Sequence, residues 1–243
     1  MCTVTFLPLA KQVFLTSNRD ESKERSTAIY PEVYQLSSGR ILFPKDADAG
    51  GTWIALHENG NAIVFLNGAI TKHEHLPPYR KSRGLILLEL IDSELPFETF
   101  QKLDLDNIEP FTAIVWENRR LFECRWDGVE KHVACPDPSR PHIWSSVTLY
   151  NPEIIAKREG WFKEWLQKIP FPTQEDIIRF HQFTGDGDSR NDLRMNRNGE
   201  TFTVSITSLK LENLRSVIQY LDLKNDRKSV AEFTMEKHIP VLK

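Results

Sequence analysis

The sequence has 243 residues, of which 40% are hydrophobic and 27% are charged, as in a globular protein with a sizeable core. Its formal net charge of -3 offers no basic surface for nucleic acid, so no nucleic-acid partner is expected. No stretch reaches the roughly 20 apolar residues that span a bilayer, and the start lacks the cationic region of a secretory signal. The length suits one domain over residues 1–243.

The cysteines and histidines predict neither a metal site nor a cofactor. Cys2, Cys124 and Cys135 are odd in number and form no CxxC pair, which argues against a disulfide framework and against zinc. His73 and His75 lie one residue apart in a loop, but no third ligand of suitable spacing accompanies them. This cysteine usage predicts a protein of the reducing cytoplasm.

The opening of the chain predicts a β-hairpin. Apolar residues alternate over residues 3–9 and 12–16, and Lys11 marks the turn between the two runs. A hairpin brings its ends together, so we expect Cys2 to lie beside residues 18–20.

The rest of the chain predicts strands, then helices, then strands again. Asn59-Gly60 is a strong hairpin signal, and Ser82, Asn151 and Thr173 are candidate helix N-caps. The predicted strands cover residues 31–36, 41–43, 52–57, 62–67, 111–117, 121–126, 129–134, 202–209 and 216–223, and the predicted helices cover 85–91, 152–169 and 173–183. Because hairpins dominate, we predict an α+β fold of mainly antiparallel sheets covered by helices on their outer faces.

Cys2 is the candidate nucleophile. An initiator methionine before a small residue is normally removed, which would leave a thiol and a free α-amine on one residue. Their reference pKa values, about 8.5 and about 7.7 to 8.0, allow the amine to deprotonate the thiol near neutral pH. Arg19 would favour the thiolate, and Asp20 could orient the amine. The alternative is a cysteine packed in a first strand.

Three further positions are candidates for substrate contacts. Asn67 ends a predicted strand before Gly68, where a side-chain amide could stabilise an oxyanion; the alternative is a plain turn. Gly51 permits a close approach of backbone or ligand, or else forms a bulge. Arg83 belongs to a basic cluster that either attracts an anionic substrate group or is solvated surface.

These residues together resemble one protein family. The resemblance is to the NRDE family, which is Transport and Golgi organisation 2-like, and it is carried by Met1-Cys2, Ser17-Asn18-Arg19-Asp20-Glu21, Gly50-Gly51-Thr52-Trp53, Asn67 and Ser82-Arg83-Gly84. The family looks like a branch of the N-terminal nucleophile hydrolases, similar to choloylglycine hydrolases and penicillin V acylases. The resemblance implies a four-layer α-β-β-α sandwich.

The resemblance also implies roles for individual residues. Cys2 would be the nucleophile with its own amine as base, Asp20 would orient that amine, and Asn67 would bind the oxyanion. The sequence departs from the hydrolases at two positions. Their helpful arginine lies three residues before the aspartate, at Ser17 here, and a second oxyanion asparagine falls near Ser146. We predict that the Ser146 hydroxyl or a backbone amide replaces this asparagine.

Three functions follow as hypotheses. The first is hydrolysis or acyl transfer at a non-peptide amide bond of a small molecule by an N-terminal cysteine. The second, implied by the resemblance, is a non-catalytic carrier or trafficking factor for a hydrophobic ligand such as haem or lipid, with Gly51 and Trp53 lining the ligand groove. The third is a scaffold in which Arg19 and Asp20 bridge two layers.

Overall fold

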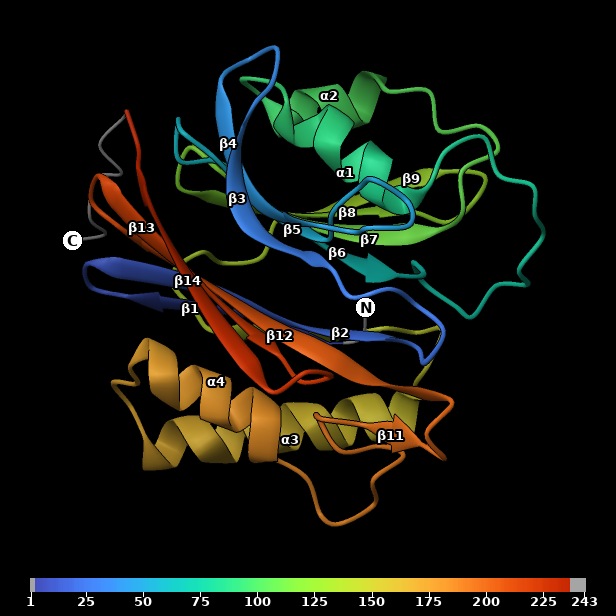
Figure 1. Ribbon diagram of the computed structural model, residues 1–243, viewed down its shortest axis with the longest axis vertical. Helices are drawn as coiled ribbons and strands as arrows, with labels where there is room; N and C mark the ends of the chain where they lie inside the picture. The colour runs from blue at the N-terminus through green and yellow to red at the C-terminus, as the bar shows by residue number, and fades with distance from the viewer. Residues whose placement is uncertain (1–2, 237–243) are drawn as a thin grey trace.

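Two antiparallel sheets pack face to face, and helices cover the outer face of each (Figure 1). The computed structural model describes residues 3–236. Helices α1 (Arg83–Ile91) and α2 (Pro96–Lys102) lie over one sheet, and α3 (Pro152–Lys168) and α4 (Gln174–Phe183) over the other. The predicted α+β fold and its four-layer α-β-β-α order are confirmed.

The two sheets differ in how the chain builds them. The first sheet joins both ends of the described chain, whereas the second is a meander in sequence order. The strands of the first, in spatial order, are β10 (His142–Ser145), β1 (Thr3–Leu9), β2 (Gln12–Ser22), β12 (Thr201–Glu212), β13 (Arg215–Asp222) and β14 (Arg227–Thr234), with β11 (Asn196–Arg197) paired to β12. Those of the second are β3 (Ile29–Gln35), β4 (Arg40–Lys45), β5 (Ile54–His57), β6 (Ala62–Asn67), β7 (Phe111–Glu117), β8 (Arg120–Trp126) and β9 (Lys131–Ala134).

The predicted first hairpin is confirmed, and its second strand is longer than expected. Thr3 pairs with Asn18, and Leu9 pairs with Gln12. Strand β2 runs on to Ser22, past the end of its apolar alternation, because β12 pairs with it on the other side. The side chains of Asn18, Arg19 and Asp20 in this extension are buried and hydrogen-bonded, so this segment lies within a central strand.

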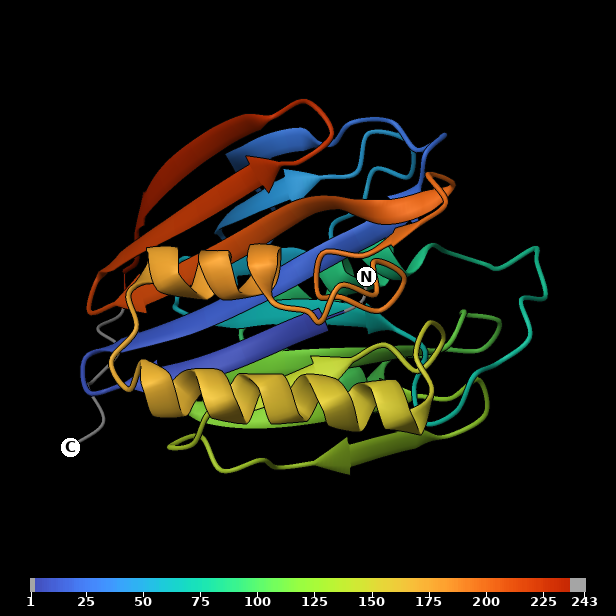
Figure 2. The ribbon, with the colours of Figure 1, turned by 90° about the horizontal axis from the view of Figure 1, so that it is seen from below.

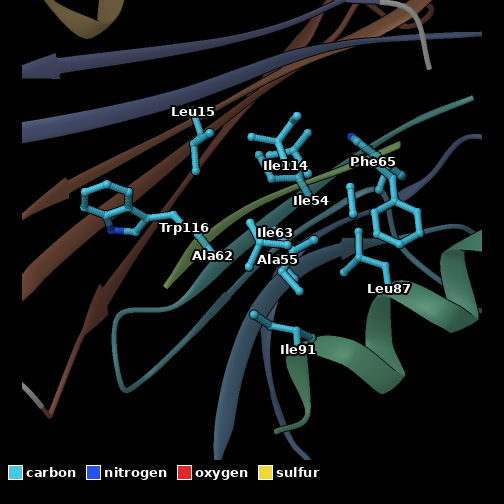
Figure 3. Packing of buried hydrophobic residues seen from close by; sticks show 14 of the residues in the cluster. Leu15, Ile54, Ala55, Ala62, Ile63, Phe65, Leu87, Ile91, Ile114 and Trp116 are labelled. Carbon is cyan, nitrogen blue, oxygen red and sulfur yellow. The ribbon is translucent and has the colours of Figure 1, made fainter. Parts of the chain in front are cut away.

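The main core fills the space between the sheets and under α1. Figure 3 shows Ile114 and Trp116 of β7 pointing toward Leu15 of β2, while Leu87 and Ile91 of α1 cover the opposite face of the same sheet. The rings of Phe6 and Trp116 lie 5.4 Å apart across the two sheets. Burial of this apolar surface is the dominant stabilising contribution to the fold.

A second, smaller core lies between the first sheet and α3 and α4. Leu7 and Phe14 leave their strands on the face opposite Phe6 and Leu15, and they pack on Phe162 of α3, among other residues. Figure 2 shows α3 and α4 crossing this outer face. Thr173 caps α4 through a complete capping box, as its spacing to Asp176 predicts.

Helix α2 and strands β11 and β14 are among the elements that the sequence patterns do not predict. Helix α2 has only seven residues, begins at Pro96, and is held by Glu117, which accepts a hydrogen bond from the Phe97 amide at 2.8 Å. Strand β14 is a largely exposed edge strand whose hydrophobic alternation is weak. No helix formed by residues 3–236 has the length and apolar character needed to cross a membrane.

Candidate active site

A pocket of about 420 Å³ brings together five of the predicted site residues. It lies where the end of β2 meets the loop before β5, the end of β6 and the first turn of α1. The five residues are Arg19, Gly51, Trp53, Asn67 and Arg83. They are far apart in the sequence, and the packing of the two sheets against each other brings them to one place.

Arg19 is held rigidly in this pocket. It leaves β2 on the face toward the second sheet and is 2% exposed. Its guanidinium lies 4.6 Å from the centre of the Trp53 ring, and Nη2 donates to Asp46 Oδ2 at 2.5 Å. A buried guanidinium needs such a partner, because an unpaired charge is costly to remove from water.

Asp46 is the acceptor that organises the cationic side of the pocket. Burial raises the pKa of its carboxyl, but the Ala49 amide and the guanidinium groups of Arg19 and Arg25 together hold that pKa below its usual range. Arg25 Nη2 donates to the same oxygen at 3.0 Å. Asp46 is therefore a carboxylate at neutral pH.

The glycines of the two loop motifs allow their backbones to touch. A Cβ atom on Gly51 would lie 2.3 Å from the Gly84 carbonyl carbon, and one on Gly84 would lie 2.9 Å from both the nitrogen and the oxygen of Thr52. The Thr52 amide donates to the Gly84 carbonyl at 3.2 Å. This contact fixes the first turn of α1, and with it Arg83, at the pocket wall.

Arg83 contacts carboxylate and carbonyl oxygens at the pocket wall. Its Nη2 lies 3.1 Å from Glu109 Oε2, and Nη1 donates to the Pro110 carbonyl at 3.3 Å. Burial lowers the pKa of the Arg83 guanidinium, and Glu109 opposes this effect. Glu109 also meets His75 Nδ1 at 3.2 Å, so it joins the wall to the loop that follows β6.

Asn67 and Ser146 lie side by side but play different parts. The Ser146 hydroxyl donates to the Asn67 carbonyl at 2.7 Å and lies 2.7 Å from Thr148 Oγ1. Asn67 lines the pocket together with Phe65, and its side-chain amide has no hydrogen-bond partner within the part of the chain that the structure describes. Within residues 3–236 the Asn67 amide therefore donates to no partner, whereas the Ser146 hydroxyl donates its proton to a backbone carbonyl.

Asp20 lies outside this pocket. Strand alternation turns it to the face opposite Arg19, where it accepts from Thr203 Oγ1 at 2.6 Å and from the Tyr150 hydroxyl at 3.3 Å. Along β2 it lies two residues beyond Asn18, the partner of Thr3. The Asp20 carboxylate therefore lies near the end of the sheet at which the described part of β1 begins.

Cys2 lies outside the described residues. Thr3, the next residue, pairs with Asn18 on one side and with Ser145 on the other. The following residues along those two strands are Arg19, which lines the pocket, and Ser146, which binds Asn67. On each of the two strands that flank Thr3, the next residue therefore either lines the pocket or contacts a residue that lines it.

A second, larger groove lies next to the segment that follows Ser146. It has a volume of about 810 Å³ and lies between residues 70–72 and the stretch from Val147 into α3. Its lining includes the apolar residues Ile70, Leu149, Ile154 and Ile155, and Ile70 is exposed. Volumes in this range are typical of small-molecule sites.

Sequence reasoning missed several residues of the site. Asp46 stands just before the predicted glycine motif, and a buried acidic partner for Arg19 was the signal that could have found it. Tyr150 and Thr203 carry no such local signal, because they reach Asp20 only through the packing of the first sheet. No group of three His, Cys, Asp or Glu within residues 3–236 is arranged to hold a metal ion.

Comparison with solved structures defines the class of fold. The Caenorhabditis elegans N-acylethanolamine-hydrolyzing acid amidase (NAAA) ortholog is similar with a TM-score of 0.58 and 11% identity, over 86% of this chain and 92% of that one. The C2A mutant of conjugated bile acid hydrolase from Clostridium perfringens gives a TM-score of 0.49 and 12% identity, over 98% of each chain. The fold is that of the N-terminal nucleophile hydrolases.

The family follows from the sequence. The family model for Transport and Golgi organisation 2 matches residues 1–180, and the chain belongs to that family. The match covers the pocket residues, both strands of the first hairpin and α3. A comparison with curated proteins finds no match.

Proposed function

We propose that the protein is an N-terminal cysteine amidohydrolase or acyltransferase that acts on a carbon-nitrogen bond of a small molecule. The observation that carries the proposal is the pocket beside the start of β1, where Arg19 and the side-chain amide of Asn67, which has no partner among residues 3–236, converge. The proposal requires removal of Met1, a Cys2 thiol facing this pocket, and a reducing compartment such as the cytoplasm.

The first half of the reaction forms a thioester. The α-amine of Cys2 takes the thiol proton, and the sulfur attacks the amide carbonyl carbon to form a carbon-sulfur bond. Asn67 stabilises the oxyanion of the tetrahedral intermediate, together with a backbone amide. The intermediate collapses by breaking the carbon-nitrogen bond, and the ammonium returns its proton to the leaving nitrogen.

The second half releases the acyl group. The free α-amine takes a proton from water, whose oxygen attacks the thioester carbonyl, and the carbon-sulfur bond breaks to give the acid and the thiol. An amine acceptor in place of water would give acyl transfer. Asp20 orients the α-amine throughout. Its position near the end of β2, beside the start of β1, supports this role.

The two hollows support a substrate with one polar and one apolar half. The pocket around Arg19 is lined by charged and polar groups, which suit the polar part of an amide. The larger groove beside Val147 and Ile154 suits an apolar acyl group. The name of the similar Caenorhabditis elegans enzyme, an N-acylethanolamine-hydrolyzing amidase, agrees with this division.

Acylation of the purified protein tests the proposal. A p-nitrophenyl ester of butyric acid should release one equivalent of nitrophenolate in a burst and leave a butyryl adduct that peptide mass spectrometry places on Cys2. The Cys2→Ala variant should show no burst, and the Cys135→Ala variant, which removes an exposed thiol, should show the full burst. An adduct confined to Cys135 would contradict the proposal.

A hydrophobic-ligand carrier is the second candidate, and the apolar groove favours it. A carrier does not need the thiol, so the Cys2→Ala variant would bind a fluorescent fatty acid as tightly as the parent. If Cys2→Ala binds the fatty acid like the parent but is no longer acylated, the result supports the enzyme, because the parent then performs a reaction that the variant cannot. Binding without any acylation of the parent supports the carrier.

A further inference from the structure

Arg158 of α3 is a fully buried cation beneath the start of β1. Its side chain is 0% exposed. Nη1 donates to the Thr3 hydroxyl at 2.6 Å, and Nη2 donates to the carbonyls of Asn191 and Asp192 at 3.0 and 2.7 Å. The guanidinium carbon lies 3.6 Å from the centre of the Tyr150 ring.

Arg158 differs from the other buried arginine near the site. Arg19 is paired with Asp46, whereas within residues 3–236 the guanidinium of Arg158 meets neutral oxygens and a ring face and forms no ion pair. Burying a charge without an ionic partner is costly. Packing alone therefore does not account for a guanidinium here.

The contacts of Arg158 lead to both groups that the proposed reaction needs. Thr3 is the residue that follows Cys2, and the Arg158 bond to its hydroxyl fixes the side of β1 that faces α3. Tyr150, stacked under the guanidinium, donates its hydroxyl to Asp20. One side chain thus contacts the neighbour of the nucleophile and the neighbour of the carboxylate that orients the amine.

We propose that Arg158 is a positioning residue for acylation, which holds the start of β1 and the Tyr150-Asp20 pair in one geometry. This inference rests on the proposed function. Arg158 touches neither pocket, so it acts through Thr3 and Tyr150. Its loss is expected to slow the bond-forming step while leaving substrate affinity unchanged.

Saturation kinetics of acylation test this role. The burst with p-nitrophenyl butyrate gives a limiting acylation rate constant and a half-saturating ester concentration. In Arg158→Met we expect the rate constant to fall about tenfold to a hundredfold, as for small misplacements of reacting groups, with the half-saturating concentration within about twofold. Arg158→Lys keeps the charge and should recover part of the rate. Thr3→Val, which removes only the hydroxyl acceptor, should lose about threefold.

Controls separate positioning from stability. Arg120 also stacks on a ring, that of Phe122 at 4.7 Å, but on the far sheet, so Arg120→Met should acylate at the parent rate. A folded Arg158→Met that acylates within twofold of the parent overturns the inference, and if that variant does not fold, an unchanged rate in Thr3→Val overturns it. A parent protein that never acylates at Cys2 refutes the proposed function, and this inference falls with it.

Discussion

Arg19 and Asp20 are neighbours in the sequence, but their side chains serve opposite faces of β2. Arg19 points toward the second sheet and the pocket, and Asp20 points toward Tyr150 and the helices. This follows from the alternation of a β-strand. At the residue scale the Asn18-Arg19-Asp20 segment therefore contributes side chains to two sides of the first sheet. Arg19 lines the pocket, and Asp20 lies near the start of β1.

Asn67 is expected to matter for chemistry and not for stability. Because its side-chain amide has no partner among residues 3–236, Asn67→Ala should leave the free energy of unfolding within about 0.5 kcal/mol while slowing acylation about a hundredfold to a thousandfold. Urea denaturation and the nitrophenolate burst measure the two effects.

Asn61 provides the matched control for Asn67. Its amide donates to the Glu94 carbonyl at 3.0 Å in a buried position outside the pocket. Asn61→Ala should therefore cost about 1 kcal/mol of stability and leave acylation unchanged. Parent-like acylation in Asn67→Ala would assign the oxyanion to another donor.

Asp46 is expected to matter for stability first. In Asp46→Asn the buried Arg19 guanidinium loses its nearer carboxylate and keeps only Glu21 at 3.6 Å, so we expect a loss of about 3 kcal/mol in the free energy of unfolding. Asp48→Asn, which removes an exposed carboxylate from the same loop, should cost less than about 1 kcal/mol. Equal unfolding midpoints in urea for the two variants would contradict the account of the Arg19 site.

At the scale of elements, a bulge in β12 matches the two faces of β2. Thr203 pairs with Asp20 and Ser205 pairs with Arg19, so Val204 is the extra residue. Thr203 and Ser205 would share a face in a regular strand, and the bulge puts them on opposite faces. The Thr203 hydroxyl can then bind Asp20 while the strand continues its pairing with β2.

The contact between the loop before β5 and α1 is the second element-scale feature, and Gly84→Ala probes it. The new methyl would meet the Thr52 backbone at 2.9 Å, which is too close, so we expect a loss of about 1 to 3 kcal/mol and weaker binding of the polar half of a substrate. Differential scanning calorimetry measures the first effect.

Gly160 is the control for that substitution. It lies inside α3, and a methyl group added to it would have no neighbouring side chain or strand within 4 Å, so Gly160→Ala should raise stability by about 0.5 to 1 kcal/mol. A Gly84→Ala protein as stable as Gly160→Ala would show that the close backbone contact does not exist.

At the scale of the whole molecule, His181 links α4 to the first hairpin and makes stability depend on pH. Asn18 donates its amide hydrogens to the carbonyls of His181 and Leu193, so its oxygen accepts from His181 Nδ1, and Nε2 accepts from the Thr5 hydroxyl. Burial, with a smaller effect of Arg158, lowers the pKa of His181 to about 3.

The direction of the pH effect follows from this pKa. Between about pH 6.5 and pH 3 the unfolded chain binds a proton at His181 that the folded chain does not, so stability falls as pH is lowered through this range. We expect urea denaturation at pH 7 and pH 5 to show this loss in the parent, and a smaller loss in His181→Gln. His57, whose pKa burial also lowers, accounts for part of the remaining slope. The control is His75→Gln, which changes an exposed side chain. An identical pH dependence of stability in the parent and in His181→Gln would contradict the assignment to His181.

The sequence predicts much of this molecule because its patterns are local. Alternation predicts the first hairpin and most of the meander, and Ser82, Asn151 and Thr173 cap their helices as expected. Periodicity could not reveal the extension of β2, since its polar residues are buried by partners distant in the sequence. Arg158 and Tyr150 are likewise invisible without the tertiary structure, because each acts through a contact across layers.

The central claim concerns the first residue of the mature chain, and intact-mass analysis of the purified protein tests it directly, with sequencing of the N-terminal peptide. The account predicts a chain that lacks Met1 and begins with an unmodified Cys2 whose α-amine is free. A protein that retains Met1, or whose Cys2 amine is acetylated, would contradict the proposed mechanism, because no α-amine would then be available to take the thiol proton.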